Sequence, residues 1–387
     1  MGGRGQTTTK MDIPETMKCV RCHAPGDYRV EEVGVPEVGE GELLVKVLAV
    51  GICAGDAKCF AGAPYYWGNS DRACYIQPPV IPGHEFAGEV VRLGEGSAEK
   101  YGLAVGDHAI AEQIVPCWDC HYCKNGHYNL CIPHDVFGWR QKTQGGMAVY
   151  MKYPKGSIVH KIPPSIPGWQ TPFIEPLACS VHAVNLGEIQ RGDVVVVSGC
   201  GPLGLGMVAA AKLKSPKTLI ALDLYDWKLE VAKSCGADLV FNPRQCNVVK
   251  EVVSLTEGRG CDIYIESTGH GESVRQGLTM VRPRGRLVEY GVFGGDVSLD
   301  WSLSSRKGEV ECNMSTNYTM SYYTEITIVG GHLGPGCYPQ AISMLESGAL
   351  PIEKVITHQL DMTDVVEGIK MVTDSSKSIK IILLPNF

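Results

Sequence analysis

Three kinds of segment are missing from this sequence. No apolar run reaches the ~18 residues of a membrane-spanning helix, and we expect no membrane span. No cluster of lysine and arginine occurs and the net charge is −7, which argues against nucleic-acid binding. The first residues, MGGRGQTTTK, lack the apolar core of a secretory signal. We therefore expect a globular protein of the cytoplasm, with a disordered leader over residues 1–16.

The chain has 387 residues, a length typical of two domains, and its pattern of apolar residues, glycine and proline changes along its length. The first part has short β-prone runs broken by glycine and proline, at 43–50, 89–93 and 147–151. From residue 190, apolar runs alternate with helical stretches, which predicts βαβ units and a doubly wound parallel sheet of the α/β class. Strands are expected at 194–197, 218–222, 238–241, 262–265, 286–290 and 380–384. Helices are expected at 203–214, 227–235, 246–255, 272–280, 341–347 and 363–372.

Four of the sixteen cysteines form a C-x2-C-x2-C-x7-C cluster: Cys117, Cys120, Cys123 and Cys131. Four thiolates at this spacing can enclose one zinc ion in a tetrahedral shell. Disulfides fit poorly because nothing indicates secretion. Iron–sulfur clusters use similar runs, but no proline directly follows Cys131 and no second cluster motif is present. The spacing predicts a structural zinc lobe over about 116–132.

A glycine-rich turn follows the apolar run 194–197. Gly199, Gly201 and Gly204 form the G-x-G-x-x-G pattern that lets a strand turn tightly into a helix and a pyrophosphate approach the backbone. Asp223 ends the next predicted strand, where a carboxylate binds the ribose hydroxyls of NAD and repels the 2′-phosphate of NADP. Lys228 either reaches the same ribose or is a solvated surface lysine. The pattern predicts an NAD site.

A second metal site is suggested by Cys53, His84, Glu85 and Glu175. Each has a plain structural interpretation as a buried thiol, a core histidine or a helix-capping carboxylate. Together, a thiolate, an imidazole and a carboxylate can form a catalytic zinc site with one open coordination position. Spacing alone does not select this set.

In chain order, Cys53, the stretch IPGHEFAGEV, the cysteine lobe, Glu175-Pro176, the turn VVVVSGCGPLGLGMVAAAK and the stretch GGHLGP resemble the zinc-dependent medium-chain alcohol dehydrogenases. Within that family the likeness is to polyol and threonine dehydrogenases, over residues 17 to about 304 and 326–387. It implies a GroES-like β-rich catalytic domain at 17–170 and 331–387, with a Rossmann NAD-binding domain at 171–330. It also implies two zinc ions per chain and a homo-oligomer, a tetramer or a dimer.

The resemblance also implies roles for individual residues. Glu175 takes the place of a second cysteine ligand, while Glu85 ligates the catalytic zinc or lies one water away and exchanges with Glu175. Asp56 is expected to lie behind the metal ligands, where it orients one of them or neutralises local charge. The cofactor is expected to contact the Gly-rich turn and its neighbours, Asp223, Lys228 and two further loops. These residues are Gly199, Gly201, Pro202, Leu203, Gly204, Ser267, Thr268, Gly269, Tyr290, Gly291 and Val292.

The activity implied is oxidation of a small polyol, erythritol or L-threitol to erythrulose, with the alcohol oxygen on zinc and the hydride passing to NAD⁺. One alternative is an L-threonine 3-dehydrogenase, for which Arg140 is a possible carboxylate partner. A second is a dinucleotide-binding protein without catalysis.

Two segments depart from the family pattern. Gly55 stands where a serine or threonine usually relays the alcohol proton, so a water or Glu85 must substitute, or turnover is slow. On the sequence alone, Gly55→Ser should keep or raise activity. The stretch 309–323 is longer than in relatives.

Overall fold

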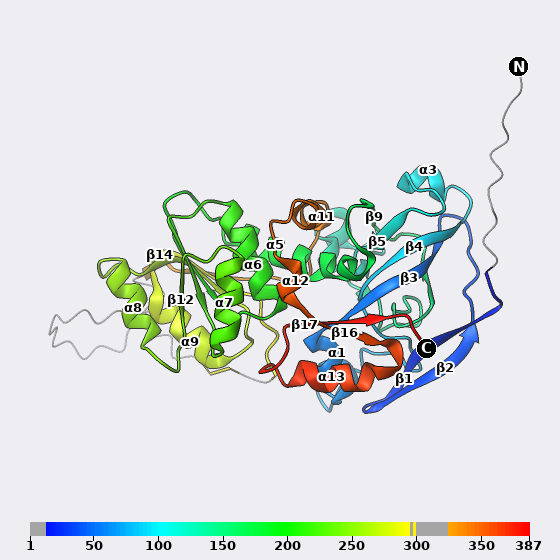
Figure 1. The fold of residues 1–387 in the computed structure, drawn as a ribbon, viewed down its shortest axis with the longest axis horizontal. Helices are drawn as coiled ribbons and strands as arrows, with labels where there is room; N and C mark the ends of the chain where they lie inside the picture. Colours follow the sequence, from blue (N-terminus) through cyan, green and yellow to red (C-terminus); the bar gives the residue numbers. More distant parts are fainter. Residues whose placement is uncertain (1–12, 295–296, 299–323) are drawn as a thin grey trace, which may run out of the picture.

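The computed structural model describes residues 13–294, 297–298 and 324–387. Two bodies lie side by side in Figure 1: a parallel sheet with its helices, formed by the middle of the chain, and a β-rich body formed by both of its ends. Within the described ranges, no helix is long and apolar enough to cross a membrane. The predicted α/β class is confirmed.

The β-rich body is built on a seven-stranded sheet. Its strands are β3 (Leu43–Ile52), β4 (Glu85–Leu93), β5 (His108–Ala111), β8 (Tyr150–Tyr153), β9 (Val159–Ile162), β16 (Ile356–Asp361) and β17 (Lys380–Leu384). The order is β16-β17-β3-β4-β5-β9, with β8 also paired to β3. β17 runs antiparallel to β3, with Ile382 opposite Gly51, so the C-terminal strand lies beside one from the first part of the chain (Figure 1).

Strand β4 begins at Glu85, whereas the sequence predicted a strand only from residue 89. The charge of Glu85 and the small Gly88 hide the apolar pattern in this stretch. Pairing with β3 decides it, because Glu85 lies opposite Gly51 and Gly88 opposite Val47. A Cβ at Gly88 would lie 2.5 Å from the Val45 Cγ2, so a glycine is needed where the two strands approach closely.

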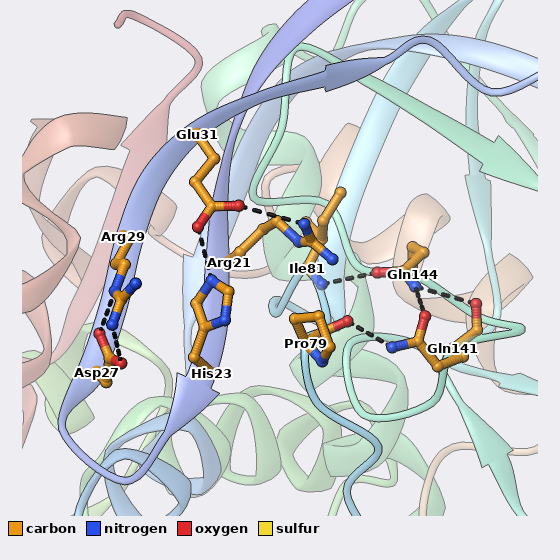
Figure 2. Close-up of polar contacts among 9 residues, drawn as sticks. All are labelled: Arg21, His23, Asp27, Arg29, Glu31, Pro79, Ile81, Gln141 and Gln144. Carbon is orange, nitrogen blue, oxygen red and sulfur yellow. Dashed lines mark hydrogen bonds and ion pairs between the residues drawn. The ribbon is translucent and has the colours of Figure 1, made fainter.

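An antiparallel hairpin of β1 (Thr16–Ala24) and β2 (Asp27–Gly34) precedes this sheet. Figure 2 shows Glu31 of β2 accepting hydrogen bonds from Arg21 at 3.2 Å and His23 at 2.6 Å. Strand β1 begins at Thr16, the last residue of the predicted leader. Residues 1–12 of that leader, and the stretch 309–323, lie outside the described residues.

The second body is a six-stranded parallel sheet in the order β12-β11-β10-β13-β14-β15. Its strands are β10 (Val194–Ser198), β11 (Thr218–Leu222), β12 (Leu239–Phe241), β13 (Cys261–Glu266), β14 (Val281–Glu289) and β15 (Thr327–Gly330). The chain order reverses between β10 and β13, and in such sheets a ligand crevice opens at the carboxyl ends of the strands on either side of that reversal. The predicted helices are found as α6 (Pro202–Leu213), α7 (Asp226–Ser234), α8 (Val248–Leu255), α9 (Gly271–Met280), α11 (Tyr338–Glu346) and α13 (Val365–Thr373).

Helix α5 (Ile174–Leu186) joins the two bodies. One hydrophobic core contains Leu177 of this helix together with Val197 of β10 and Ile382 of β17. The helix is buried along most of its length, so its position is fixed by packing on both sides. Glu175, in its first turn, is thereby held between the two sheets.

Candidate active site and metal centres

The four cysteines of the lobe come together as the spacing predicted. Their sulfur atoms all lie within 4.8 Å of one another. The backbone N–H of Cys120 donates to the Cys117 Sγ, and that of Cys117 donates to the Cys131 Sγ, both at 3.3 Å. Backbone hydrogen bonds lower the pKa of Cys117 and lower that of Cys120 to about 6, whereas burial raises the pKa of Cys131 and raises that of Cys123 to about 12 in the absence of metal. Thiolates are the form that binds zinc, so this cluster fits a zinc ion.

A second group gathers Cys53, His84 and Glu85, whose ligand atoms also lie within 4.8 Å of one another. Cys53 is the N-cap of α1 (Ala54–Phe60), directly after β3, and Glu85 begins β4. Because β3 and β4 pair with Gly51 opposite Glu85, the two neighbouring strands bring these side chains together. His84 and Glu85 are buried. The sulfur, imidazole and carboxylate donors match the chemistry of zinc.

The segment that leads to His84 is held by amide side chains, as Figure 2 shows. The Gln144 Oε1 accepts a hydrogen bond from the backbone N–H of Ile81 at 2.7 Å. The Gln144 amide donates in turn to the Gln141 carbonyl at 3.0 Å, and the Gln141 amide donates to the Pro79 carbonyl. This network fixes the loop backbone three residues before the imidazole.

Asp56 lies behind the imidazole. Its Oδ2 accepts the backbone N–H of Cys53 at 2.9 Å, and its Oδ1 lies 3.8 Å from the His84 Nδ1. The Asp56 Oδ1 and the His84 Nδ1 are both buried, and neither has a hydrogen-bond partner among the described residues. Burial by itself lowers the pKa of His84, but Asp56 and Cys53 raise it well above its ordinary value. The 3.8 Å separation is an electrostatic contact and not a hydrogen bond, and it places a carboxylate where it can favour one orientation of the imidazole.

Glu175 lies near this group but outside it. Its Oε1 accepts a hydrogen bond from the Cys179 Sγ at 3.3 Å. Burial, followed by the charge of Glu85, raises the pKa of Glu175 to about 7. The structure therefore groups Glu85 with Cys53 and His84, and holds Glu175 as a neighbouring carboxyl group.

Lys380 is a member of this site that the sequence analysis missed. It is 1% exposed, and its Nζ pairs with the Glu85 Oε2 and donates to the Ile52 carbonyl at 3.0 Å. Lys380 opens β17, and the pairing of β17 with β3 carries it to a glutamate 295 residues away. A buried cation balances the carboxylate charge that would otherwise be unpaired.

In the zinc-free protein, replacing Lys380 with methionine should lower the free energy of unfolding by about 3 kcal/mol, because the buried Glu85 carboxylate is then left without a cation. Urea unfolding measures this change. In the double variant Lys380→Met/Glu85→Gln no unpaired charge remains, and most of the lost stability should return. A Lys380→Met protein as stable as the wild type would contradict the charge-balancing role.

The glycine-rich turn is shaped for a close ligand. Gly199 has φ of +98°, and a Cβ at Gly204 would lie 1.8 Å from the Gly199 carbonyl oxygen. By contrast, nothing lies within 4 Å of the place where a Cβ at Gly201 would stand. Pro202 and Leu203 begin α6 directly after it. The turn thus offers a helix N-terminus and open space, which fits a pyrophosphate.

Asp223 directly follows β11, and Lys228 of α7 lies close to it. The Asp223 carboxylate accepts the backbone N–H groups of Cys200 at 2.7 Å and Tyr225 at 2.9 Å. Lys228 is 4% exposed; burial lowers its pKa and Asp223 opposes that shift. Of the two interpretations of Lys228, the solvated surface lysine is wrong, because the side chain is buried beside Asp223.

The loops expected near the nicotinamide are tied together by Glu266, which the sequence analysis did not single out. The buried Glu266 carboxylate accepts the backbone N–H groups of Thr268 at 2.7 Å and Gly269 at 3.1 Å. A Cβ at Gly291 would lie 2.3 Å from the Glu266 Oε2. Ser267 donates its hydroxyl to the Ser198 carbonyl at 2.7 Å, which holds this loop against β10.

The loop Tyr290-Gly291-Val292 contacts both bodies. The Tyr290 hydroxyl donates to the Leu333 carbonyl, and the Val292 carbonyl accepts a hydrogen bond from Lys58 of α1. Helix α1 also begins beside Cys53. The predicted cofactor loops and the predicted metal group are therefore linked through one short helix.

Residues 39–164 match the alcohol dehydrogenase GroES-like domain, and residues 202–347 match the zinc-binding dehydrogenase domain. The chain belongs to the zinc-dependent medium-chain dehydrogenases, which are NAD(P)-dependent oxidoreductases. The predicted GroES-like and Rossmann architecture is confirmed.

The individual relatives include both predicted branches. The chain is 48% identical to an erythritol/L-threitol dehydrogenase of Mycolicibacterium smegmatis, over 96% of this chain and 99% of that one. It is 35% identical to an L-threonine 3-dehydrogenase of Pyrococcus horikoshii, over 96% and 99%.

Solved structures show the same fold with cofactors bound. A zinc-binding dehydrogenase from Sinorhizobium meliloti with NADP has a TM-score of 0.81 and 28% identity, over 96% of this chain and 100% of that chain. A short chain alcohol dehydrogenase from Escherichia coli CFT073 with NADH has a TM-score of 0.80 and 26% identity, over the same shares.

Proposed function

We propose that this protein is an NAD-dependent zinc dehydrogenase that oxidises a small polyol, erythritol or L-threitol, to erythrulose. The observation that carries the proposal is the group of Cys53, His84 and Glu85, which α1 links to the Val292 loop through the hydrogen bond of Lys58. The erythritol/L-threitol dehydrogenase relative, at 48% identity, supports the polyol substrate.

In this proposal Cys53, His84 and Glu85 hold the catalytic zinc, and the lobe cysteines Cys117, Cys120, Cys123 and Cys131 hold the structural one. Bound zinc would supply a Lewis acid and bound NAD⁺ a hydride acceptor. Asp56, whose Oδ1 lies 3.8 Å from the His84 Nδ1, would orient the imidazole through its charge. Glu175 lies next to this group, where burial and the charge of Glu85 raise its pKa to about 7, and it would exchange a proton with a bound alcohol.

The preference for NAD rests on Asp223. Its carboxylate stands at the carboxyl end of β11 beside the buried Lys228, and there it would accept hydrogen bonds from the ribose hydroxyls and repel a 2′-phosphate.

Replacing Asp223 with asparagine should raise the KM for NAD⁺ about tenfold, because a charged hydrogen bond contributes about 1.5 kcal/mol or more. It should also improve use of NADP⁺, because the repulsive charge is gone. Initial rates with both cofactors measure this. Asp226→Asn is the matched control, since Asp226 bonds to Asn242 and Gln245 instead. Unchanged cofactor discrimination in Asp223→Asn would contradict the assignment.

The main alternative substrate is L-threonine, supported by the relative at 35% identity. A threonine site needs a partner for the carboxylate, and Arg140 was the candidate. Arg140 donates to the Tyr75 carbonyl at 2.8 Å, and its Nε lies 3.6 Å from the Asp135 carboxylate. This engagement disfavours it as a substrate ligand. A dinucleotide-binding protein without catalysis is disfavoured by the intact Cys53–His84–Glu85 group.

The test is NAD⁺ reduction by the purified protein with erythritol, L-threitol and L-threonine in parallel, together with the zinc content. Rapid NADH formation with the polyols alone, at two zinc ions per chain, is the expected result. Activity with threonine alone would move the assignment to amino-acid oxidation, and silence with all three would overturn it. We also propose a cytoplasmic homo-oligomer, a tetramer or a dimer, on the family resemblance; light scattering tests the oligomer.

A further inference from the structure

The space beside Gly55 is not empty. A Cβ placed on Gly55 would lie 2.8 Å from the Tyr66 hydroxyl oxygen, 3.7 Å from the Cys53 Sγ and 3.9 Å from the His84 Cε1. The position of this Cβ is therefore close to Cys53 and His84 of the proposed catalytic zinc group and also to the phenol oxygen of Tyr66. The Tyr66 hydroxyl therefore occupies the position that a longer side chain at residue 55 would fill.

The ring of Tyr66 is held firmly in that position. Tyr66 lies on α2 (Pro64–Trp67) and is 8% exposed. Its ring packs on Trp139 with centroids 4.7 Å apart, and Trp139 packs on His84 at 5.6 Å. Its carbonyl accepts the backbone N–H groups of Tyr75 and Ile76, at 2.9 and 3.0 Å. Such packing leaves the ring little freedom to turn away from the metal group.

The Tyr66 hydroxyl is available for a hydrogen bond to a ligand. Tyrosine hydroxyl groups that are carried into a protein interior normally find a hydrogen-bond partner. Among the described residues no hydrogen-bond partner of the Tyr66 hydroxyl is found, and its oxygen is not one of the fully buried polar atoms that lack a partner, so it remains accessible to a ligand. A neutral group that can both donate and accept suits an alcohol hydroxyl.

We propose that the Tyr66 hydroxyl hydrogen-bonds the hydroxyl group of the substrate at the Cys53–His84–Glu85 group, in the space that Gly55 leaves open. Tyr66 is then a catalytic residue that the sequence analysis missed. This inference rests on the proposed function, because it needs an alcohol at that group. It also reverses the expectation for Gly55→Ser: a new side chain would collide with the phenol oxygen, so we expect loss of activity.

The two residues should therefore depend on each other. Tyr66→Phe removes one oxygen and should lower kcat/KM for L-threitol about ten- to hundredfold, the range expected when a hydrogen bond made to the reacting group is lost. Gly55→Ser alone should lower it by a similar factor. In Gly55→Ser/Tyr66→Phe the collision is relieved and a hydroxyl is restored, so the double variant should be more active than either single variant.

The experiment measures kcat/KM for the four proteins and, by calorimetry, the affinity of L-threitol for their complexes with NADH. Zinc content, the KM for NAD⁺ and the melting temperature should stay at wild-type values in Tyr66→Phe, which separates a role in binding from a role in folding. Tyr65→Phe, on the exposed neighbouring ring, is the matched control and should behave as wild type.

Two results would overturn the proposal: a Tyr66→Phe protein with wild-type kcat/KM and threitol affinity, or a double variant in which the two losses simply multiply. Failure of the polyol assignment looks different, since the wild type would then be silent with L-threitol and active with L-threonine. The same four proteins assayed with L-threonine would decide the role of Tyr66 in that case.

Discussion

His84→Ala should lower kcat/KM by at least ~10³-fold and reduce the zinc content from two ions to one per chain. His84 is the imidazole of the Cys53–His84–Glu85 group, and its loss also removes the ring nitrogen that lies 3.8 Å from the buried Asp56 carboxylate. A bound metal contributes several kcal/mol of transition-state stabilisation in enzymes of this kind, and each ~1.4 kcal/mol is a factor of ten in rate. Steady-state kinetics and elemental analysis of the same sample measure both effects.

The matched control for this variant is His121→Ala. His121 is an exposed histidine on α4 (His121–Lys124), inside the cysteine lobe but outside both ligand groups. It should retain both zinc ions and the wild-type rate. If His84→Ala also kept two zinc ions and full activity, the catalytic site would have to lie elsewhere.

Cys123→Ser should remove the other zinc ion and destabilise the whole lobe. Structural zinc contributes on the order of 10 kcal/mol to small zinc-dependent folds, which is comparable to the total stability of many domains. Polar contacts of the lobe with the rest of the protein include Trp118, which donates to the Gly156 carbonyl at 2.9 Å, Asn129, which donates to the His332 carbonyl at 3.0 Å, and Tyr128, which donates to Glu112 at 2.8 Å. These hydrogen bonds do not replace the metal.

Thermal unfolding and zinc analysis test this variant. We expect one zinc ion per chain and a melting temperature lower by more than ~10 °C, from a loss of several kcal/mol. Cys246→Ser, in the dinucleotide-binding body, is the control and should change little. A Cys123→Ser protein that melts with the wild type would show that the lobe is held by its protein contacts alone.

The local motifs of the sequence predict their own geometry. The four lobe cysteines come together because a short backbone joins them, and backbone N–H groups reach their sulfurs within the same loop. The turn from Gly199 to Gly204 is equally local, since its strand, glycines and helix are contiguous. The alternating apolar runs predicted the parallel sheet for the same reason: each strand and helix carries its own pattern.

Only the tertiary structure decided the relations between distant segments. Lys380 reaches Glu85 because β17 pairs with β3 in one register, and no pattern near either residue records that pairing. Glu175 was placed beside the metal group and not within it by the packing of α5.

The same holds for Gly55 and Lys228. The sequence around Gly55 indicates only that a hydroxyl is absent, whereas the fold places the Tyr66 hydroxyl beside this glycine. The burial of Lys228 results from the packing of α7 on the sheet. Spacing along the chain therefore determined the zinc lobe, the dinucleotide turn and the fold class. The charge balance and the hydroxyl at the catalytic group depend on strand register and side-chain packing, which arise only when residues far apart in sequence meet.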